Sequence, residues 1–254
     1  FPFFVRGDDV SFSIVNDFNI VTLPGVYSSQ DSDFSDKESL QTRYLDLRSH
    51  LSHHLALPSM DIGRIRTLSI PAWFFMGSLA QFHYETLETI NMALEDVMRG
   101  PAFFADNADM AARRTAIGQI RKNEAWKPLT GALPRSKYRF DPRRNLVMRL
   151  LMKYTLNGHL LPFYGLWGNR VTVQARQRGQ LHEIWGASQI TYVSGDGTQT
   201  FTARHSKLAA LKQGLRMMKN GMRFAWNYNK LKSEWQAGYK ELASTRFWEE
   251  KFGA

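Results

Sequence analysis

The sequence predicts an α+β protein, in which the end of an α/β unit is followed by a mainly helical C-terminal region with a small antiparallel β-hairpin sheet. Apolar residues recur at helical spacing through much of residues 36–156. Short runs rich in β-branched and aromatic residues follow, with a turn at Ser194–Gly197 that is typical of a hairpin. We therefore expect three parts, which span 1–36, 37–160 and 161–254.

Residues 1–36 are expected to be the end of the α/β unit. Phe3-Phe4-Val5 is typical of a short strand, and residues 19–23 form a second β-rich segment. Ser35 or Asp36 is then expected to begin a long helix, because short polar side chains accept hydrogen bonds from the first amides of a helix. Since the chain enters directly into a strand, we expect it to be the C-terminal piece of a longer protein.

The middle part is predicted to be helical. Apolar residues at helical spacing predict helices over 36–56, over two segments between 60 and 98, over 106–122 and over 142–156. Gly100-Pro101 is expected to stop the helix before it, and the Pro- and Gly-containing residues 124–144 are expected to form a loop.

The last part is predicted to combine short strands with basic helices. The expected strands are 171–173, 182–185, 189–193 and 199–202, of which the last two form the hairpin. A basic helix is expected from about 206 to 239 and a short helix at 245–252.

Composition and charge limit the classes of function. The chain has 254 residues and no cysteine, which excludes disulfides, thiolate nucleophiles and cysteine-ligated zinc. No apolar run reaches the roughly 18 residues of a membrane span, so a soluble or peripheral protein is expected. Residues 1–40 carry two basic and seven acidic side chains, whereas 204–254 carry eleven and four. The acidic head indicates a cation or polyhydroxyl partner, and the basic tail an anionic surface or an acidic neighbour.

Two adjacent carboxylates, Asp8 and Asp9, follow the first predicted strand. In a catalytic interpretation, Asp9 takes the proton of a sugar hydroxyl as it attacks an anomeric carbon, while Asp8 positions the acceptor. The diphosphate leaving group of such a displacement is usually neutralised by a divalent cation on oxygen ligands, for which Asp31 and Asp33 are candidates. The alternative interpretation is turn chemistry and helix capping, a common use of aspartates at strand ends.

Four motifs follow one another in this region. They are Phe-Val-Arg-Gly-Asp-Asp-Val-Ser-Phe-Ser from Phe4, Val-Thr-Leu-Pro-Gly from Val21, Ser-Asp-Lys-Glu from Ser35, and Arg-Tyr-Leu-Asp-Leu-Arg-Ser from Arg43. In this order they resemble the bacterial galactofuranosyltransferases that polymerise galactan, within the inverting family 2 glycosyltransferases. The similarity continues at lower density to the C-terminus, through Arg99-Gly100-Pro101, Val193–Gly197 and Trp248-Glu249.

The resemblance implies roles for individual residues. Asp9 matches the family's general base and Asp8 its acceptor contact. Asp31 stands where the family has a metal-binding histidine, which makes it the implied ligand of Mn²⁺ or Mg²⁺. Phe34 falls where the family has a tryptophan near the sugar, and Lys37 belongs to the Ser-Asp-Lys motif that is implied to bind substrate.

By the same resemblance, residues 1–36 are the acceptor-side end of a GT-A domain. The donor-binding strand and its Asp-x-Asp motif would lie upstream, so this fragment alone is expected to be inactive. Gly7 replaces the tryptophan that precedes the aspartate pair in the family. The implied reaction is the metal-dependent, inverting transfer of galactofuranose from UDP-galactofuranose to a growing lipid-linked cell-surface glycan. The implied location is cytoplasmic, peripheral on the inner face of the cell membrane.

The basic tail, residues 204–254, allows three interpretations: a solvated face over a packed core, a surface that docks on anionic lipid headgroups, or nucleic-acid binding. The resemblance favours lipid over nucleic acid, because the family's polymer is anchored to a polyprenyl diphosphate in a membrane. No nucleic-acid partner is therefore expected. The alternative function is a non-catalytic C-terminal scaffold for membrane docking or oligomerisation, and a homo-oligomer is one expected form of it.

Overall fold

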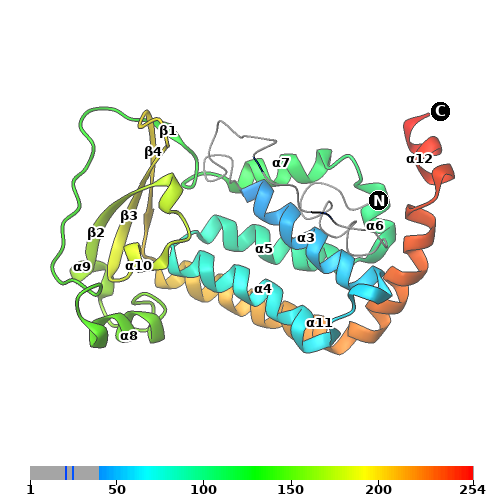
Figure 1. The fold of residues 1–254 in the computed structure, drawn as a ribbon, viewed down its shortest axis with the longest axis horizontal. Coiled ribbons are helices and arrows are strands. Elements are labelled where there is room, and N and C mark those ends of the chain that lie inside the picture. The colour runs from blue at the N-terminus through cyan, green and yellow to red at the C-terminus, as the bar shows by residue number, and fades with distance from the viewer. Residues whose placement is uncertain (1–20, 22–24, 26–39, 254) are drawn as a thin grey trace.

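The structure, a computed structural model, describes residues 21, 25 and 40–253 (Figure 1). The helices are α3 (Leu40–Ala56), α4 (Gly63–Ala80), α5 (Tyr84–Val97), α6 (Gly100–Asp106), α7 (Ala111–Ile120), α8 (Leu146–Tyr154), α9 (Tyr164–Trp167), α10 (Leu181–Ile184), α11 (Lys207–Leu242) and α12 (Thr245–Phe252). The strands are β1 (Lys127–Pro128), β2 (Asn169–Gln174), β3 (Ala187–Val193) and β4 (Gln199–Arg204). In the described residues a mainly helical fold with one small sheet confirms the predicted α+β class, whereas the predicted GT-A segment, 1–36, lies outside them except for residues 21 and 25.

Helices α3, α5 and α11 form the centre of the main core, because each packs an apolar stripe against the other two. The spacing that predicted α3 is the spacing of its buried side chains, since Leu40, Leu47, Leu51 and Leu55 are all at most 1% exposed. Helices α4 and α6 also contact α11, and α7 contacts α3 and α5.

Helix α11 is the longest element among the described residues. Its 36 residues correspond to roughly 54 Å at 1.5 Å per residue. In Figure 1 it runs from the sheet to α12 along the lower side of the bundle. Its C-terminal half is fixed in the core by Phe224, Tyr228, Leu231 and Trp235, and the Trp235 indole N–H donates to the Val97 carbonyl at 3.0 Å.

The four strands form a sheet in the order β1-β4-β3-β2. The predicted hairpin is confirmed, since β3 and β4 pair antiparallel around the turn after Val193. The prediction that the small sheet is antiparallel does not hold for β2, which pairs parallel to β3. A parallel pair requires a crossover connection, which residues 175–186 provide by passing through a 3₁₀ turn and α10 before β3 begins.

That crossover also explains a second error of prediction. Residues 182–185, predicted to be a strand, belong mostly to α10. Leu181 and Ile184 lie three positions apart, so one helical turn points both side chains into the core of the sheet. As predicted, the helix before Gly100-Pro101 does not continue through this pair, since α5 ends at Val97. The pair also begins α6, where proline is favoured because a first-turn amide needs no partner.

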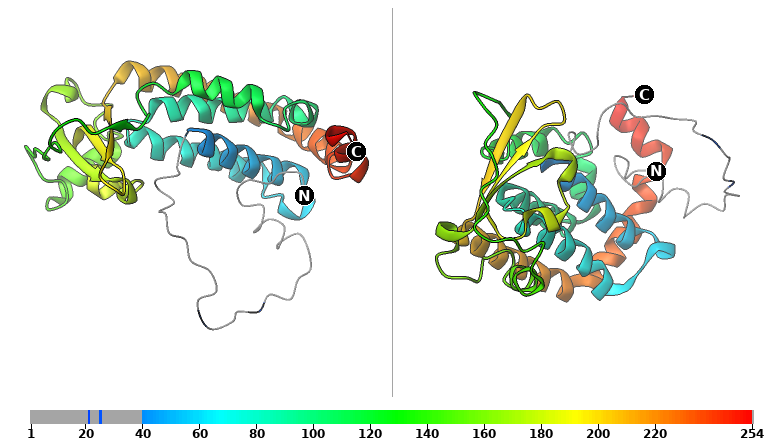
Figure 2. Two further views of the ribbon diagram at one scale, coloured as in Figure 1. Left: turned by 90° about the horizontal axis from the view of Figure 1, so that it is seen from above. Right: turned by 60° about the vertical axis from the view of Figure 1, so that its left-hand side comes forward.

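The sheet lies at one end of the bundle, and α12 lies at the other (Figure 2). The turn between α4 and α5 joins the two parts, since Phe82 is 2% exposed and packs into the core of the sheet. The next residue, His83, places its ring 5.1 Å from the Tyr192 ring and 5.8 Å from the Phe201 ring. The sheet is thus joined to α5 by aromatic packing.

Candidate functional site

The predicted catalytic and binding residues Asp8, Asp9, Asp31, Phe34 and Lys37 all lie outside the described residues. Their roles stay predictions. Among residues 21, 25 and 40–253, no group of three or more His, Asp or Glu side chains is arranged to hold a metal ion.

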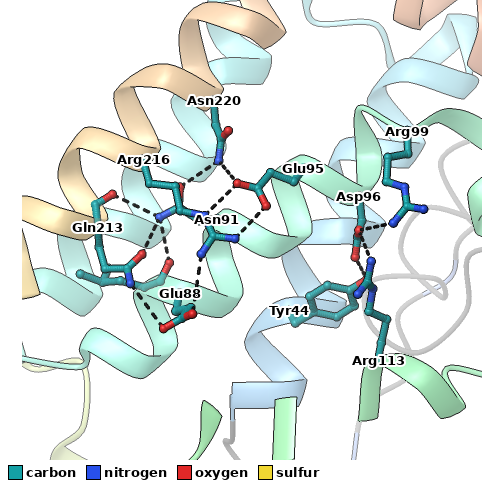
Figure 3. Close-up of polar contacts among 11 residues, drawn as sticks. Tyr44, Glu88, Asn91, Glu95, Asp96, Arg99, Arg113, Gln213, Arg216 and Asn220 are labelled. Atoms are coloured by element: carbon teal, nitrogen blue, oxygen red, sulfur yellow. Dashed lines mark hydrogen bonds and ion pairs between the residues drawn. The ribbon is translucent and has the colours of Figure 1, made fainter. Parts of the chain in front are cut away.

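The motif Arg43–Ser49 forms the first half of α3, and its Tyr44 contacts α5 in the core of the bundle (Figure 3). The Tyr44 hydroxyl donates to Asp96 Oδ2 at 2.8 Å, and Arg113 Nη2 donates to Asp96 Oδ1 at 2.6 Å. Burial raises the pKa of Asp96, while Tyr44 and Arg113 oppose that rise. In the described chain this motif holds α3, α5 and α7 together.

A polar network fixes the inner face of α11 against α5 (Figure 3). Arg216 binds Glu95 through two hydrogen bonds, from Nε to Oε1 at 2.8 Å and from Nη2 to Oε2 at 2.7 Å. Asn220 donates to the same Glu95 Oε1 at 2.8 Å, and Asn91 donates to Gln213 Oε1 at 3.2 Å. The hydrogen bond from Arg216 is the main reason why the pKa of Glu95 lies below its usual range. Because these contacts are directional, they set the rotation of α11 about its axis.

That rotation turns an apolar stripe of α11 to the outside. We call this set the outer stripe; it consists of Leu208, Leu211, Leu215, Met218, Met222 and Trp226. Steps of three and four residues place these side chains on one helix face, over roughly 27 Å from the first to the last. All six are exposed, and Trp226 reaches 90%. A helix of a globular protein normally turns such a face to its core.

Basic side chains flank the outer stripe on one side. This basic row consists of Lys212, Lys219, Arg223 and Lys230, all of them exposed. Three members follow a stripe residue by four positions, which makes them its neighbours on the helix surface. Residues 207–233 contain seven Lys and Arg and no Asp or Glu. Within the described part of the chain, Lys212, Lys219 and Arg223 make no ion pair, whereas Arg216 and Lys232 are paired with acids of α5 and Asp61.

The apolar surface continues onto α8 and the loop to α9. In α8 only Met152 is buried, although the helix reads Leu-Val-Met-Arg-Leu-Leu-Met-Lys-Tyr. Phe163 and Leu166 follow in the loop and in α9, are both more than three-quarters exposed, and line a hollow together with Lys207, the first residue of α11. In Figure 1, α8, α4 and α11 all lie on the lower side of the molecule.

A cleft of about 760 Å³ separates α4 from α8 and α10, and we call it the α4–α8 cleft. Its walls are mostly apolar or aromatic, including Trp73, Met76, Tyr154 and Trp185. Arg43 and Lys153 are the charged side chains among its described lining residues. Its size is typical of ligand sites, which span roughly 300–1,000 Å³.

A second hollow, of about 700 Å³ and more polar, lies between α5, β4 and the loop before β1. Its buried carboxylate, Glu124, accepts the backbone amides of Glu85 at 2.7 Å and Thr86 at 3.3 Å, and the Thr86 hydroxyl at 2.5 Å. Glu85 in turn accepts the amides of Lys122, Asn123 and Glu124. Burial raises the pKa of Glu124 to about 7. The carboxylate thus caps α5 and ties the loop to it.

Two histidines line the joint between the bundle and the sheet. The Tyr84 hydroxyl lies 2.8 Å from His159 Nε2 and accepts the Ser206 amide at 2.8 Å. The rings of His159 and His205 are 4.7 Å apart, and burial together with His159 lowers the pKa of His205 to about 4. Burial also lowers the pKa of His159, and His205, with its pKa of about 4, is neutral at pH 7.

The chain matches no protein-family model and no curated protein. None of the helices within residues 40–253 combines the length and the apolarity needed to cross a membrane. The outer stripe could have been found from the sequence by its three-and-four spacing, whereas the cleft has no signal in the sequence, because its walls come from separate segments.

Proposed function

We propose that this chain is the C-terminal part of an inverting glycosyltransferase and that residues 40–253 hold the enzyme on an anionic membrane surface. The observation that carries the docking role is the outer stripe with its basic row, in a stretch without acidic residues. The observation that supports the catalytic role is the ordered series of galactofuranosyltransferase-like motifs over residues 4–49.

In the proposed reaction, Asp9 removes the proton of an acceptor hydroxyl as that oxygen forms a bond to the anomeric carbon of the donor sugar. The bond from that carbon to the diphosphate breaks, and UDP leaves with the electron pair, so the anomeric configuration inverts. Asp8 would hold the acceptor, and Phe34 and Lys37 would contact the substrate. The Asp31 carboxylate suits Mn²⁺ or Mg²⁺, which would neutralise the departing diphosphate. The donor is UDP-galactofuranose and the acceptor a lipid-linked glycan.

The docking role follows from the amphipathic character of the exposed face of α11. A helix that lies in a membrane interface places its apolar side chains below the headgroups and its basic side chains among them. Each Lys or Arg near an anionic surface contributes roughly 1 kcal/mol, and salt screens this attraction. The exposed apolar residues of α8 and α9 would extend the contact. We therefore place the enzyme on the cytoplasmic side, peripheral to the inner face of the cell membrane.

The docking role can be tested by co-sedimentation of the full chain with vesicles of phosphatidylglycerol and phosphatidylcholine. We expect the double variant Lys212→Glu/Lys219→Glu to bind at least roughly thirtyfold more weakly, since two attractive charges are lost and two repulsive ones are added. The matched control is Arg114→Glu/Arg121→Glu, on α7 and at the residue that follows it, which changes the net charge equally on the upper side of Figure 1. Equal loss in both variants would contradict docking through α11.

The catalytic role requires the intact protein with its upstream segment. Asp9→Asn should abolish transfer of galactofuranose while donor binding stays nearly unchanged, because the amide cannot accept the hydroxyl proton. Full transfer activity in this variant would overturn the assignment of Asp9.

The second candidate is a non-catalytic scaffold, which is favoured by the fact that the outer stripe and basic row are formed entirely by residues of α11. This candidate predicts vesicle binding without any sugar transfer by the intact protein. Homo-oligomerisation would be the alternative use of the stripe. Sedimentation velocity without vesicles distinguishes membrane docking from homo-oligomerisation. If the chain is a dimer that Leu215→Ser and Met218→Ser dissociate, the outer stripe binds a second copy of the chain.

A further inference from the structure

We propose that the α4–α8 cleft takes one hydrocarbon chain of an anionic phospholipid drawn from the membrane surface. This inference rests on the proposed docking function only for the source of the lipid. The cleft itself is formed by residues that are separate from the outer stripe.

The walls of the cleft suit a hydrocarbon chain. From α4, Trp73 and Met76 face it, and Leu181 and Trp185 close it from the side of α10. Its polar residue Gln81 already donates to the Gly77 carbonyl at 3.0 Å and accepts the Gly179 amide at 3.1 Å. A chain of methylenes can therefore lie against Gln81 without breaking either of these hydrogen bonds, and each buried methylene favours binding.

The charges of the cleft select an anionic head. Arg43 and Lys153 contribute to its lining, and its described lining residues include no Asp or Glu. Lys153 is exposed and makes no ion pair with any described residue. A phosphate at the mouth of the cleft would be attracted by Lys153, whereas a cationic head would be repelled.

The position of the cleft indicates that the chain comes from a membrane. Trp73 is 77% exposed and Tyr154 is 73% exposed, although both contribute to the cleft. Trp and Tyr at a membrane surface place their apolar rings at the level of the headgroups. Helix α8, which carries Tyr154, exposes Leu146, Val147, Leu150 and Leu151 as well. The cleft thus lies beside the apolar surface that the proposed docking would bring to the lipid.

The test measures binding of dodecyl phosphate to the full chain by calorimetry, below the concentration at which this amphiphile forms micelles and without vesicles. We expect saturable binding of one amphiphile per chain and little binding of inorganic phosphate or dodecyltrimethylammonium. Gly77→Leu should weaken binding at least about tenfold, because a Cβ at Gly77 meets no atom within 4 Å and the added side chain would fill the cleft.

Gly118→Leu on α7 is the matched control, since it also adds a leucine where a Cβ meets no atom within 4 Å. Both substitutions replace a poor helix former by a good one, so thermal unfolding should show that neither variant is less stable than the original protein. Lys153→Glu, a change at an exposed residue, should weaken dodecyl phosphate binding about tenfold, in keeping with the loss of one charged contact.

Unchanged binding in Gly77→Leu would overturn the proposal, and so would equal binding of inorganic phosphate. Binding of geranylgeranyl phosphate but not of dodecyl phosphate would also overturn it, since the cleft would then belong to an isoprenoid. The Lys212→Glu/Lys219→Glu variant separates the two proposals. It should lose vesicle binding but keep dodecyl phosphate binding, so a failure of docking and a failure of the cleft give different results.

Discussion

Glu124 links the stability of the bundle to pH. It is 8% exposed and accepts hydrogen bonds from the first turn of α5. Its pKa is raised by burial from an ordinary 4.5 to about 7. Between these two pH values the folded state keeps a proton that the unfolded chain has released. The stabilisation is therefore fully present below pH 4.5 and is lost as the pH rises through 7.

The size of the effect follows from the two pKa values. One pH unit corresponds to 1.36 kcal/mol, so deprotonation of Glu124 should lower the free energy of unfolding by about 3 kcal/mol between pH 4.5 and pH 8. Glu124→Gln removes this titration and keeps a carbonyl oxygen to accept the amides of Glu85 and Thr86. The variant should match the original protein at low pH and exceed its stability by about that amount at pH 8.

The assay is urea unfolding followed by circular dichroism at several pH values, with the two proteins compared at each pH. A second variant, Thr86→Val, removes the hydroxyl that donates to the carboxylate and should move the loss of stability to higher pH. A flat difference between the original protein and Glu124→Gln over this pH range would refute the reasoning. So would a Glu124→Gln variant that becomes the less stable protein above pH 7, since the carboxylate would then be the favoured form.

Two other predictions concern the joint and the core. The pKa of His205 is lowered from 6.5 to about 4, so the stability that this side chain contributes is present above pH 6.5 and is lost as the pH falls through 4. In urea titrations at several pH values, His205→Phe should flatten this part of the dependence of the free energy of unfolding on pH. An unchanged dependence would exclude His205 as its source. Trp235 is 1% exposed and packs edge-on against Phe104. Trp235→Ala should therefore lower the free energy of unfolding, measured in urea titrations, by about 3–5 kcal/mol. A loss below about 1 kcal/mol would contradict tight packing of the core around Trp235.

Local sequence patterns predicted the elements that are stabilised by local chemistry. The leucines of α3 and the apolar positions of α5 recur at helical spacing because one face of each helix is buried. In the structure these apolar residues are the buried ones. The hairpin between β3 and β4 follows from its glycine-containing turn. Residues 182–185, which read His-Glu-Ile-Trp, were mispredicted because so short a segment suits a strand and a helical turn equally. Only the contacts of Leu181 and Ile184 with the sheet decide between the two.

For the outer stripe and the basic row, too, the sequence predicted one property and the tertiary structure decided another. The basic excess of residues 204–254 is a property of composition, so the sequence predicted an anionic surface or an acidic neighbour as the partner of this tail. The sequence did not show which side of α11 would face that partner. Glu95 decides this by binding Arg216 and Asn220, because two directional contacts from α5 fix one face of α11 inward.

By itself, the sequence determined the helical periodicities, the hairpin and the charge asymmetry. The roles proposed for Asp8, Asp9, Asp31, Phe34 and Lys37 stay predictions, because these residues lie outside the described part of the chain. Only the tertiary structure decided that β2 runs parallel to β3, that the outer stripe stays exposed, and that α4, α8 and α10 enclose a cleft. The physical reason is range: propensity, spacing and charge act between neighbours in the chain, whereas a cleft and a buried face require segments about 100 residues apart to meet.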